Sequence, residues 1–230
     1  MTLLDDLIRA FQLIFSGNPR VTEIILRSLF VSGSATLIAI LWGIPIAALI
    51  GLNDFRGKSL VKAVFSSLIG VPTVVLGFFL FLIFSKEGGP LGFLSLLYTP
   101  TAIIIGEAIL VAPIVVSLAT SAIEAVDPSV RSLAKTLGAS ESQASFMVLK
   151  EALDGILLAG ISSFNRAIGE LGVALFVGGF ISGVTELLTT GIKVEIDLNN
   201  RDAAIALAII LLVLVFVINI ALTVIRRRRR

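Results

Sequence analysis

The amino-acid sequence predicts an all-α polytopic membrane protein, and three observations support that fold class. The 230 residues are 57% apolar and only 15% charged, and their mean hydropathy of +1.05 is typical of a membrane protein. Five segments are mostly apolar over the roughly 20 residues that a spanning helix needs. Charged residues gather between these segments, which are Leu29–Leu52, Ala63–Phe84, Ala102–Ala125, Leu153–Ile181 and Ala203–Ile225. We expect one transmembrane domain over residues 1–230, with five spans.

The chain begins with a segment that is apolar at helical spacing. Charged and polar residues (Asp5, Asp6, Arg9 and Gln12) occupy the positions between the apolar ones, which are Leu3, Leu4, Leu7, Ile8, Phe11, Ile14 and Phe15. This pattern predicts an amphipathic helix over residues 2–16 that lies in the membrane interface.

The connectors between the expected spans are polar or rich in glycine and proline. Residues 53–59 ("NDFRGKS"), 85–92 ("SKEGGPLG") and 182–202 ("SGVTELLTTGIKVEIDLNNRD") are expected to be loops. The fourth expected span is unusually long and is interrupted by Gly169 and Gly172.

The connector over residues 126–152 predicts a helix-turn-helix. Asp127 can cap a helix that has Pro128 at its first position. That helix would carry an apolar stripe and end at Gly138, and Ser140 and Gln143 have the spacing of a capping box for a second helix. The stripe is formed by Val130, Leu133, Ala134 and Leu137. From physics alone this loop either lies on the membrane surface or docks a partner.

The basic residues that flank the spans indicate the orientation of the chain. One side carries eleven of them, namely Arg56, Lys58, Lys62, Arg131, Lys135, Lys150 and the terminal run Arg226 to Arg230. The other side carries six, namely Arg9, Arg20, Arg27, Lys86, Lys193 and Arg201. We therefore expect a multi-pass protein of the plasma (inner) membrane with the 126–152 loop and the C-terminus in the cytoplasm and the N-terminus outside. Without the terminal arginines the sides are equal, so the expectation depends on them.

The composition excludes several kinds of chemistry. Cysteine and histidine are both absent, which rules out disulfides, thiol nucleophiles, imidazole catalysis and any metal site built on those residues. Five of the eighteen basic residues form the terminal run, and the net charge is only +2. We expect no metal site and no nucleic-acid partner.

The helix-turn-helix resembles a known family. "RSLAKTLGAS", followed by "VLKEALDGI", resembles the cytoplasmic EAA loop of binding-protein-dependent ABC importer permeases. Ala134 and Gly138 match the second alanine and the glycine of that motif. Ser132 stands in place of its glutamate, Leu133 in place of its first alanine and Lys150-Glu151 in place of its closing Leu-Pro.

Further stretches extend the resemblance over nearly the whole chain. "GVPTVVLGFFLFLIFSKEGGPLG", "YTPTAIIIGEAILVAPIVV", "NRAIGELG" and "LTTGIKVEID" look like the permeases of tungstate importers, and the related molybdate and sulfate permeases share the "RAxGExG" pattern. The resemblance implies a type I importer permease of MetI-like fold that carries an oxyanion, most closely tungstate, with molybdate or sulfate as alternatives.

The resemblance also implies the partners. It implies a homodimer that docks on two cytoplasmic ATPase subunits and receives the anion from an extracytoplasmic binding protein. ATP and magnesium would bind to the ATPase partners, so we expect no cofactor and no catalytic site in this chain. The residues expected to dock the ATPase are Ser129, Val130, Leu133, Ala134, Leu137, Gly138, Ala139 and Ser140.

An arginine and a glutamate interrupt the apolar pattern of the fourth expected span. In a continuous helix Ser162, Arg166 and Glu170 share one stripe. They are not expected to face lipid, where a charge costs about 2.5–3.5 kcal/mol. Arg166 could attract an oxyanion, or it could pair with Glu170 and with Glu107 of the third span. We favour the second hypothesis because two acids beside one base repel an anion.

A second stripe of this span consists of small residues that permit close helix packing, and these are Gly155, Ala159, Ser163 and Ala167. Pro72 could open a bend beside a transport path. We therefore predict path or gate positions at Pro72, Ser162, Arg166, Gly169, Glu170 and Gly172, with Glu107 as the charge partner. A secondary transporter or channel is the alternative of a different class, and it would leave the docking loop unexplained. An intramembrane enzyme would have only Glu107 and Glu170 as a carboxylate pair.

Overall fold

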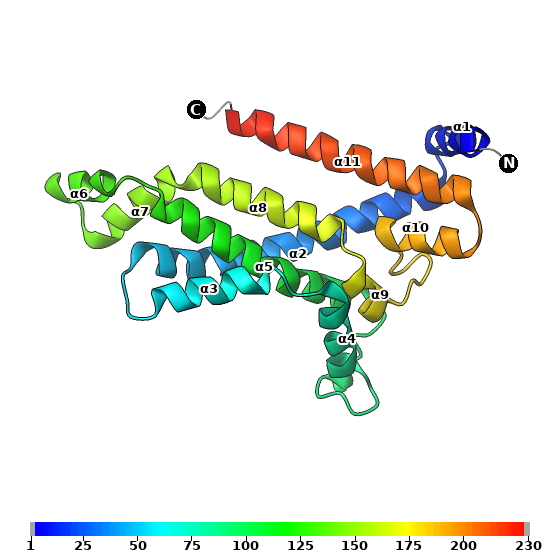
Figure 1. The fold of residues 1–230 in the computed structure, drawn as a ribbon, viewed down its shortest axis with the longest axis horizontal. Coiled ribbons are helices and arrows are strands. Elements are labelled where there is room, and N and C mark those ends of the chain that lie inside the picture. Colours follow the sequence, from blue (N-terminus) through cyan, green and yellow to red (C-terminus); the bar gives the residue numbers. More distant parts are fainter. Residues whose placement is uncertain (1–2, 228–230) are drawn as a thin grey trace. The chain divides into compact units, whose positions relative to one another are not determined.

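A computed structural model describes residues 3–227, and within these residues every regular element is a helix (Figure 1), which confirms the predicted all-α class. The helices in the first half are α1 (Leu3–Phe15), α2 (Pro19–Leu52), α3 (Lys58–Leu68), α4 (Thr73–Phe84), the short 3-10 helix η1 (Gly92–Leu94) and α5 (Pro100–Glu124). Those in the second half are α6 (Pro128–Thr136), α7 (Glu141–Glu151), α8 (Leu153–Ile168), α9 (Gly172–Gly178), α10 (Leu188–Asp197) and α11 (Arg201–Arg227).

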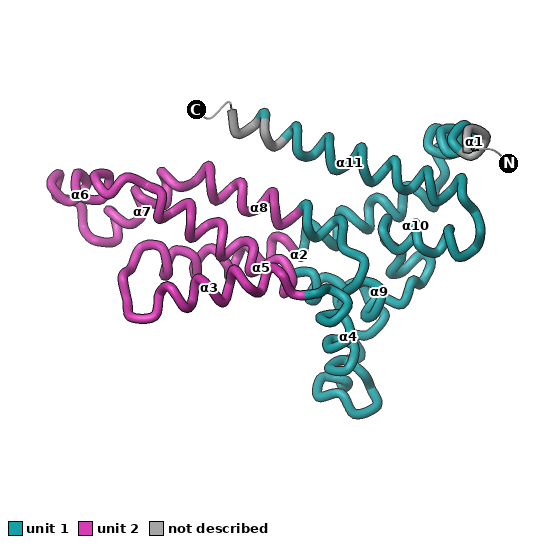
Figure 2. Tube along the Cα trace, viewed as in Figure 1, with its two compact units in different colours: residues 1–35, 72–108, 165–230 teal, residues 36–71, 109–164 magenta. Residues whose placement is uncertain are grey.

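The chain divides into two compact units (Figure 2). Unit 1 comprises residues 1–35, 72–108 and 165–230, and unit 2 comprises residues 36–71 and 109–164. The helices α2, α5 and α8 each contribute residues to both units. The expectation of one transmembrane domain over the whole chain stays a prediction.

Continuous helices cover three of the five expected spans. By length and hydropathy, α2, α5 and residues 201–221 of α11 could each cross a membrane. The second expected span is divided into α3 and α4, which pass the same test only as a broken pair. The break falls at Pro72 (φ −62°, ψ 123°), where proline lacks an N–H and disfavours a helical residue before it.

The fourth expected span, Leu153–Ile181, is also not one helix. It is divided into α8, which ends at Ile168, and α9, which begins at Gly172. With 16 residues, α8 is about 24 Å long, which is shorter than the roughly 30 Å hydrocarbon layer. The interruption predicted near the two glycines is thus confirmed.

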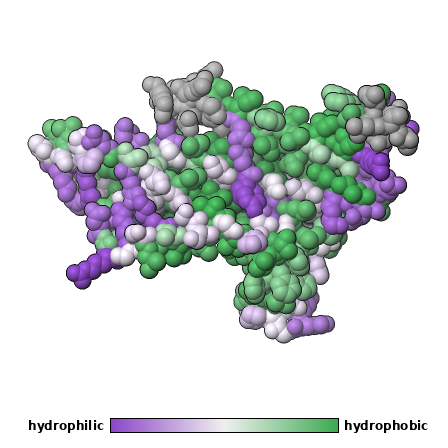
Figure 3. Space-filling view, in the orientation of Figure 1, coloured by the Kyte–Doolittle hydropathy of each residue, from purple (hydrophilic) through white to green (hydrophobic). Residues whose placement is uncertain are grey.

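In unit 1, glycines bring α4 and α9 close together. A Cβ added to Gly77 would lie 2.8 Å from the Gly172 carbonyl oxygen, and one added to Gly172 would lie 2.5 Å from Thr73 Oγ1. Around this contact a buried apolar core forms from Val31, Leu80, Phe84, Ala102, Ile103, Val173, Ala174, Val177 and Leu187. Small residues therefore set the helix spacing, as is usual in membrane proteins. Figure 3 shows the largely hydrophobic surface of α4.

In unit 2, the predicted small-residue stripe does pack closely. A Cβ added to Gly155 of α8 would lie 2.4 Å from the Ala122 Cβ of α5. Ala159 of the same stripe is fully buried. It belongs to a core with Ala47, Ala119, Ile123, Val148, Ala152 and Ile156.

The predicted N-terminal helix is present as α1. Its apolar side chains Ile8, Phe11 and Phe15 are at least half exposed, whereas Ala10 is buried. Residue 2 and the side chains of residues 3–6 lie outside the described part, as do the side chains of the terminal arginine run. The interfacial position of α1 stays a prediction, which its exposed apolar face supports.

The connector over residues 182–202 is not simply a loop, because it contains α10. Leu188, Gly191 and Glu195 recur at three- and four-residue spacing and are all buried. Leu188 packs in a small core with Ile24 and Leu207. The many polar residues of this segment concealed a helix that tertiary packing stabilises.

Candidate functional site

The loop over residues 126–152 forms the helix-turn-helix that its capping residues predicted. The Asp127 carboxylate accepts a hydrogen bond of 2.8 Å from the Ser129 N–H, and Pro128 begins α6. Gly138 follows the helix with φ +87°, a left-handed conformation that favours glycine. Ser140 then caps α7: its hydroxyl accepts from the Gln143 N–H at 3.4 Å, and its N–H donates to Gln143 Oε1 at 2.8 Å. The predicted capping box is therefore confirmed.

Ion pairs hold the two helices of this loop together. Glu141, at the start of α7, pairs with Arg131 and Lys135 of α6. Arg131 Nη1 also donates to the Leu52 carbonyl oxygen at 3.0 Å, which ties α6 to the end of α2. Lys135 and Arg131 lower the pKa of Glu141. The pKa of Asp127 is lowered by its hydrogen bonds from Ser129.

The two helices present an open apolar groove. Its volume is about 620 Å³, and its walls are Ala134, Leu137, Gly138, Ala139, Ser142, Gln143, Phe146 and Met147. Leu137 is 80% exposed, and Leu133 beside it is also exposed. Exposed apolar side chains on a rigid hairpin are typical of a docking surface.

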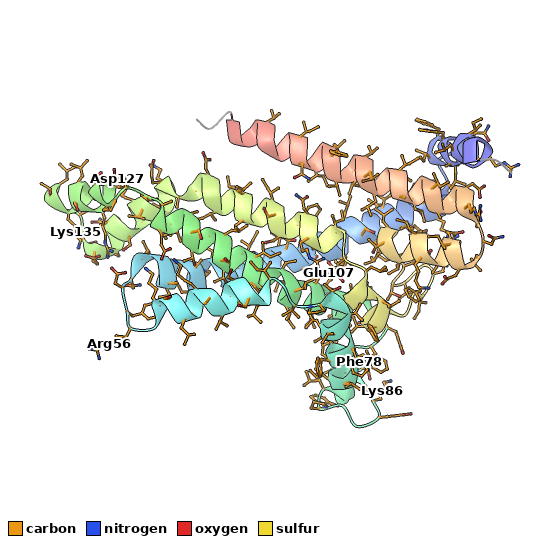
Figure 4. All side chains as sticks on the ribbon, viewed as in Figure 1. Arg56, Phe78, Lys86, Glu107, Asp127 and Lys135 are labelled. Carbon is orange, nitrogen blue, oxygen red and sulfur yellow. The ribbon has the colours of Figure 1, made fainter. Side chains whose placement is uncertain are left out.

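The apolar stripe predicted for α6 is divided in the structure. Val130 packs on the core of unit 2 and anchors the hairpin, while Leu133 and Leu137 point away from that core and are exposed. The exposed apolar residues Phe146 and Met147 of α7 were not among the predicted docking residues. Figure 4 labels Asp127 and Lys135 near the two ends of α6.

The structure confirms that Arg166 has a carboxylate partner. Arg166 Nη1 lies 2.6 Å from Glu170 Oε2. The Glu170 side chain is only 2% exposed, whereas that of Arg166 is 38% exposed. We expected Ser162, Arg166 and Glu170 to form one stripe of a continuous helix. Glu170 lies beyond the last residue of α8, so this prediction is wrong for Glu170. The ion pair nevertheless forms, because the chain turns at Gly169.

Glu170 also holds the chain at the break between α8 and α9. Its Oε1 accepts a hydrogen bond of 3.1 Å from the Val173 N–H in the first turn of α9. Its carbonyl oxygen accepts from Thr189 Oγ1 at 2.8 Å. One carboxylate therefore neutralises Arg166 and satisfies an N–H at the start of the next helix.

Glu107 does not form the expected ion pair with Arg166. Its side chain is fully buried, and neither carboxylate oxygen has a hydrogen-bond partner of ordinary geometry within residues 3–227. The polar and charged groups that interact electrostatically with its carboxylate are the Ser32 hydroxyl, Glu170 and Arg166. Arg166 is instead held by Glu170, which is nearest in sequence, and this corrects the predicted role of Glu107 as its direct partner. Figure 4 labels Glu107 on α5.

The other predicted path residues lie close to this break or on α8. Pro72 precedes α4, and Gly172 contacts the adjacent Thr73, so the two positions are brought together in unit 1. Ser162 lies on α8 and is partly buried. Gly169 is exposed and has no close neighbour that would exclude a side chain.

Sequence reasoning missed a charged network in unit 1. Arg20 Nη2 lies 2.6 Å from Glu186 Oε1, and Arg20 Nη1 lies 2.8 Å from Glu195 Oε1. Both glutamates are almost fully buried. Arg27 also donates to the Glu186 carbonyl oxygen at 3.0 Å. The network ties α2 to the segment that contains α10. The arginines of α2 and the two glutamates are distant in sequence, so no local pattern predicted the network.

Comparison with known proteins places this arrangement in a family. A family profile described as the binding-protein-dependent transport system inner membrane component matches residues 43–230. The chain is 38% identical to the tungstate uptake system permease protein TupB of Peptoclostridium acidaminophilum, over 85% of this chain and 86% of that protein. It is 33% identical to the molybdate/tungstate transport system permease protein WtpB of Pyrococcus abyssi, over 70% and 62%, and 29% identical to the sulfate transport system permease protein CysT of Salmonella typhimurium, over 78% and 67%.

Solved structures show the same fold. A chain of a bacterial ABC transporter involved in the import of alginate aligns with a TM-score of 0.76 at 18% identity, over 95% of this chain and 82% of that one. A chain of the MetNI methionine ABC transporter aligns with a TM-score of 0.73 at 17% identity, over 91% and 95%. The predicted MetI-like fold is therefore confirmed. Because most of its length is matched, this chain belongs to the family of binding-protein-dependent transport system inner membrane components.

Proposed function

We propose that this chain is the permease subunit of an ABC importer for tungstate or a chemically similar oxyanion. The observation that carries the proposal is the 38% identity to a tungstate permease over 85% of the chain. The identity to a sulfate permease is lower, at 29%, which is also the identity to a second tungstate permease, so the preference for tungstate rests on the 38% match. Molybdate remains the alternative within the same family, since a relative at 33% identity is described as carrying both.

In this proposal the hairpin of α6 and α7 transmits force from the ATPase. Two ATPase subunits would bind ATP and magnesium. In each copy of this chain, the groove beside Leu137 and Phe146 would receive an apolar ridge of one ATPase subunit. Asp127, Ser140 and Glu141 make the hairpin rigid through the bonds described above. A rigid hairpin moves as one body when its partner closes. This chain would itself catalyse no covalent step.

The dimeric assembly and the delivery of substrate belong to the same proposal. Two copies of this chain would enclose the transport path, and an extracytoplasmic binding protein would deliver the oxyanion. The hairpin and the C-terminus would lie in the cytoplasm and the N-terminus outside, as the flanking basic residues predict.

The break between α8 and α9 would act as the hinge or gate of the path. Glu170 neutralises Arg166, so the path would attract the anion only weakly there. Weak attraction allows release, and the binding protein can supply the selectivity. Alternating access would then require movement at Gly169 and Gly172, where the helix is already interrupted.

The test is ATP hydrolysis by the assembled transporter. The chain is co-purified with a candidate ATPase, placed in nanodiscs and mixed with a candidate oxyanion-binding protein. We expect the tungstate-loaded binding protein to stimulate hydrolysis, and the sulfate-treated protein to stimulate it less. Hydrolysis that no oxyanion changes, in a complex shown to be intact by gel filtration, would contradict the proposal.

A further inference from the structure

Unit 2 contains a cavity that the docking hairpin and the path residues do not use. Its volume is about 260 Å³, far above the roughly 10–15 Å³ that one water requires. It is lined by residues of α2, α3 and α5, which are joined to the 53–57 turn and to the 126–152 loop. These connectors are the ones predicted to face the cytoplasm.

The lining of this cavity is rich in hydrogen-bond donors. Lys62 contributes an ammonium group, and Ser66, Ser117, Thr120 and Ser121 contribute hydroxyls. No aspartate or glutamate lines it. The remaining walls, which include Ile50, Phe65 and Val116, are apolar. A concave site with apolar walls and a few converging donors is the usual form of a small-ligand site.

One of these hydroxyls is an unsatisfied polar group. Thr120 is 2% exposed, and within the described residues its Oγ1 has no hydrogen-bond partner. A buried hydroxyl without a partner costs free energy that a bound acceptor would recover. By contrast, Ser121 on the same helix already donates to the Ser117 carbonyl oxygen at 3.0 Å.

Lys62 forms an ion pair but keeps N–H donors for a further partner. Its Nζ lies 2.5 Å from Glu124 Oε2, which uses one of the three N–H donors of an ammonium group. Glu124 has a second partner, since its Oε1 lies 3.1 Å from Lys58 Nζ. Lys58 in turn pairs with the exposed Asp54 at 3.3 Å. Glu124 therefore still has Lys58 as an ion-pair partner when the Lys62 ammonium group turns toward the cavity.

We propose that this cavity binds a tetrahedral oxyanion, with Lys62 as the cation and with Thr120, Ser117 and Ser66 as hydrogen-bond donors. A tetrahedral anion has four oxygens and needs donors from several directions, which this lining supplies. The choice of tungstate as the preferred anion rests on the proposed function. Because Glu124 competes for Lys62, binding is weak and salt-sensitive, which suits a site that the anion occupies after release.

The test uses a reporter thiol in a chain without cysteine. Ala63 lines the cavity and is exposed, so Ala63→Cys is introduced into the intact transporter in detergent without binding protein. We expect millimolar tungstate to slow alkylation of this thiol. The added change Lys62→Gln should raise the half-protecting concentration about tenfold, the effect of one charge-assisted hydrogen bond, whereas Lys62→Arg should largely retain protection.

The matched control is Lys193→Gln in the same background. Lys193 is as exposed as Lys62, at 40%, and also pairs with a carboxylate, but it lies in unit 1. We expect this change to leave protection unaltered. As a second measurement, Thr120→Val, which keeps the shape of the side chain, should weaken equilibrium binding of radioactive tungstate to the same complex.

Two results would overturn the proposal. One is equal protection in the Lys62→Gln and parent proteins. The other is protection by vesicles of anionic lipid but not by free tungstate, which would assign the site to a lipid phosphate. Neither the alkylation nor the binding measurement requires ATP hydrolysis. If the Ala63→Cys parent shows no protection by tungstate while its oxyanion-stimulated hydrolysis is normal, this site alone is also rejected. Protection without stimulated hydrolysis would reject only the proposed transport function.

Discussion

Arg166 and Glu170 carry the charge at the interruption between α8 and α9. The guanidinium is partly exposed, but the carboxylate it neutralises is only 2% exposed and also accepts the Val173 N–H. Removing one member of such a pair leaves the other as an uncompensated charge. The arginine is therefore needed chiefly because the glutamate is buried.

We predict that Arg166→Gln destabilises the transporter by about 1–3 kcal/mol, toward the lower end because the arginine is partly solvated. The measurement is the midpoint of thermal unfolding in detergent. Lys193→Gln removes an i,i+4 pair of the same spacing that is exposed on both sides, and it should change the midpoint little. Equal shifts in the two variants would contradict the buried role of Glu170, and Arg166→Gln combined with Glu170→Gln should recover part of the loss.

At the residue scale, the sequence predicted some of these contacts and not others. The Arg166–Glu170 pair could be predicted because the two residues are close in sequence, as could the caps at Asp127 and Ser140. The contact of Arg20 with Glu186 and Glu195 could not, since residues more than 160 positions apart meet only through the fold. Glu107 was assigned the wrong partner because its distance from Arg166 depends on helix packing.

Among the elements, the hairpin of α6 and α7 depends most on its turn. Gly138 has φ +87° and no neighbour within 4 Å of an added Cβ, so a substitution there is opposed by the backbone conformation and not by space. A β-branched residue is especially unfavourable in this region.

We predict that Gly138→Val strains the turn by about 1–3 kcal/mol, changes the angle between the helices and prevents the ATPase from co-purifying with the chain. Gly88→Val is the control, because Gly88 has φ +90° and an equally open environment in a connector predicted to lie outside. Membrane insertion of both variants, measured by protease protection, should be normal. If the ATPase co-purifies equally with both, the hairpin is not the docking element.

The N-terminal cap of α6 should make the hairpin sensitive to acid. The hydrogen bonds from Ser129 lower the pKa of Asp127 below its ordinary value of 3.8. The cap therefore contributes stability above that ordinary value and loses it as the pH falls through the lowered pKa, below about pH 4. After correction for intrinsic rates, hydrogen exchange of the first-turn amides of α6 should increase in this range. Asp127→Asn should abolish the change, and an unchanged pH profile in that variant would contradict this role.

The elements differ in how well the sequence predicts them. Hydropathy and length identified α2, α5 and α11, because a mostly apolar run of about 20 residues matches the thickness of the hydrocarbon layer. The exact breaks in the second and fourth expected spans could not be derived, since they depend on packing at Pro72 and on the contact of Gly172 with Thr73. The helix α10 was missed because its buried face includes a glycine and a glutamate.

At the scale of the whole molecule, the family assignment and the fold agree. The docking loop and the "NRAIGELG" stretch predicted an importer permease, and the family profile covers residues 43–230. The transported anion is less well determined by the fold, because the aligned transporters of methionine and alginate share it. A shared fold does not determine the substrate, so the choice of substrate depends on local residues.

The most direct test of the proposed function is uptake of radioactive tungstate into proteoliposomes that contain this chain and its ATPase. With binding protein outside and ATP inside, we predict accumulation of tungstate against its gradient. Accumulation should be lost when ATP is omitted and in the Gly138→Val variant. Uptake by this chain alone, without ATPase, binding protein or ATP, would contradict the permease assignment and identify a channel or secondary transporter.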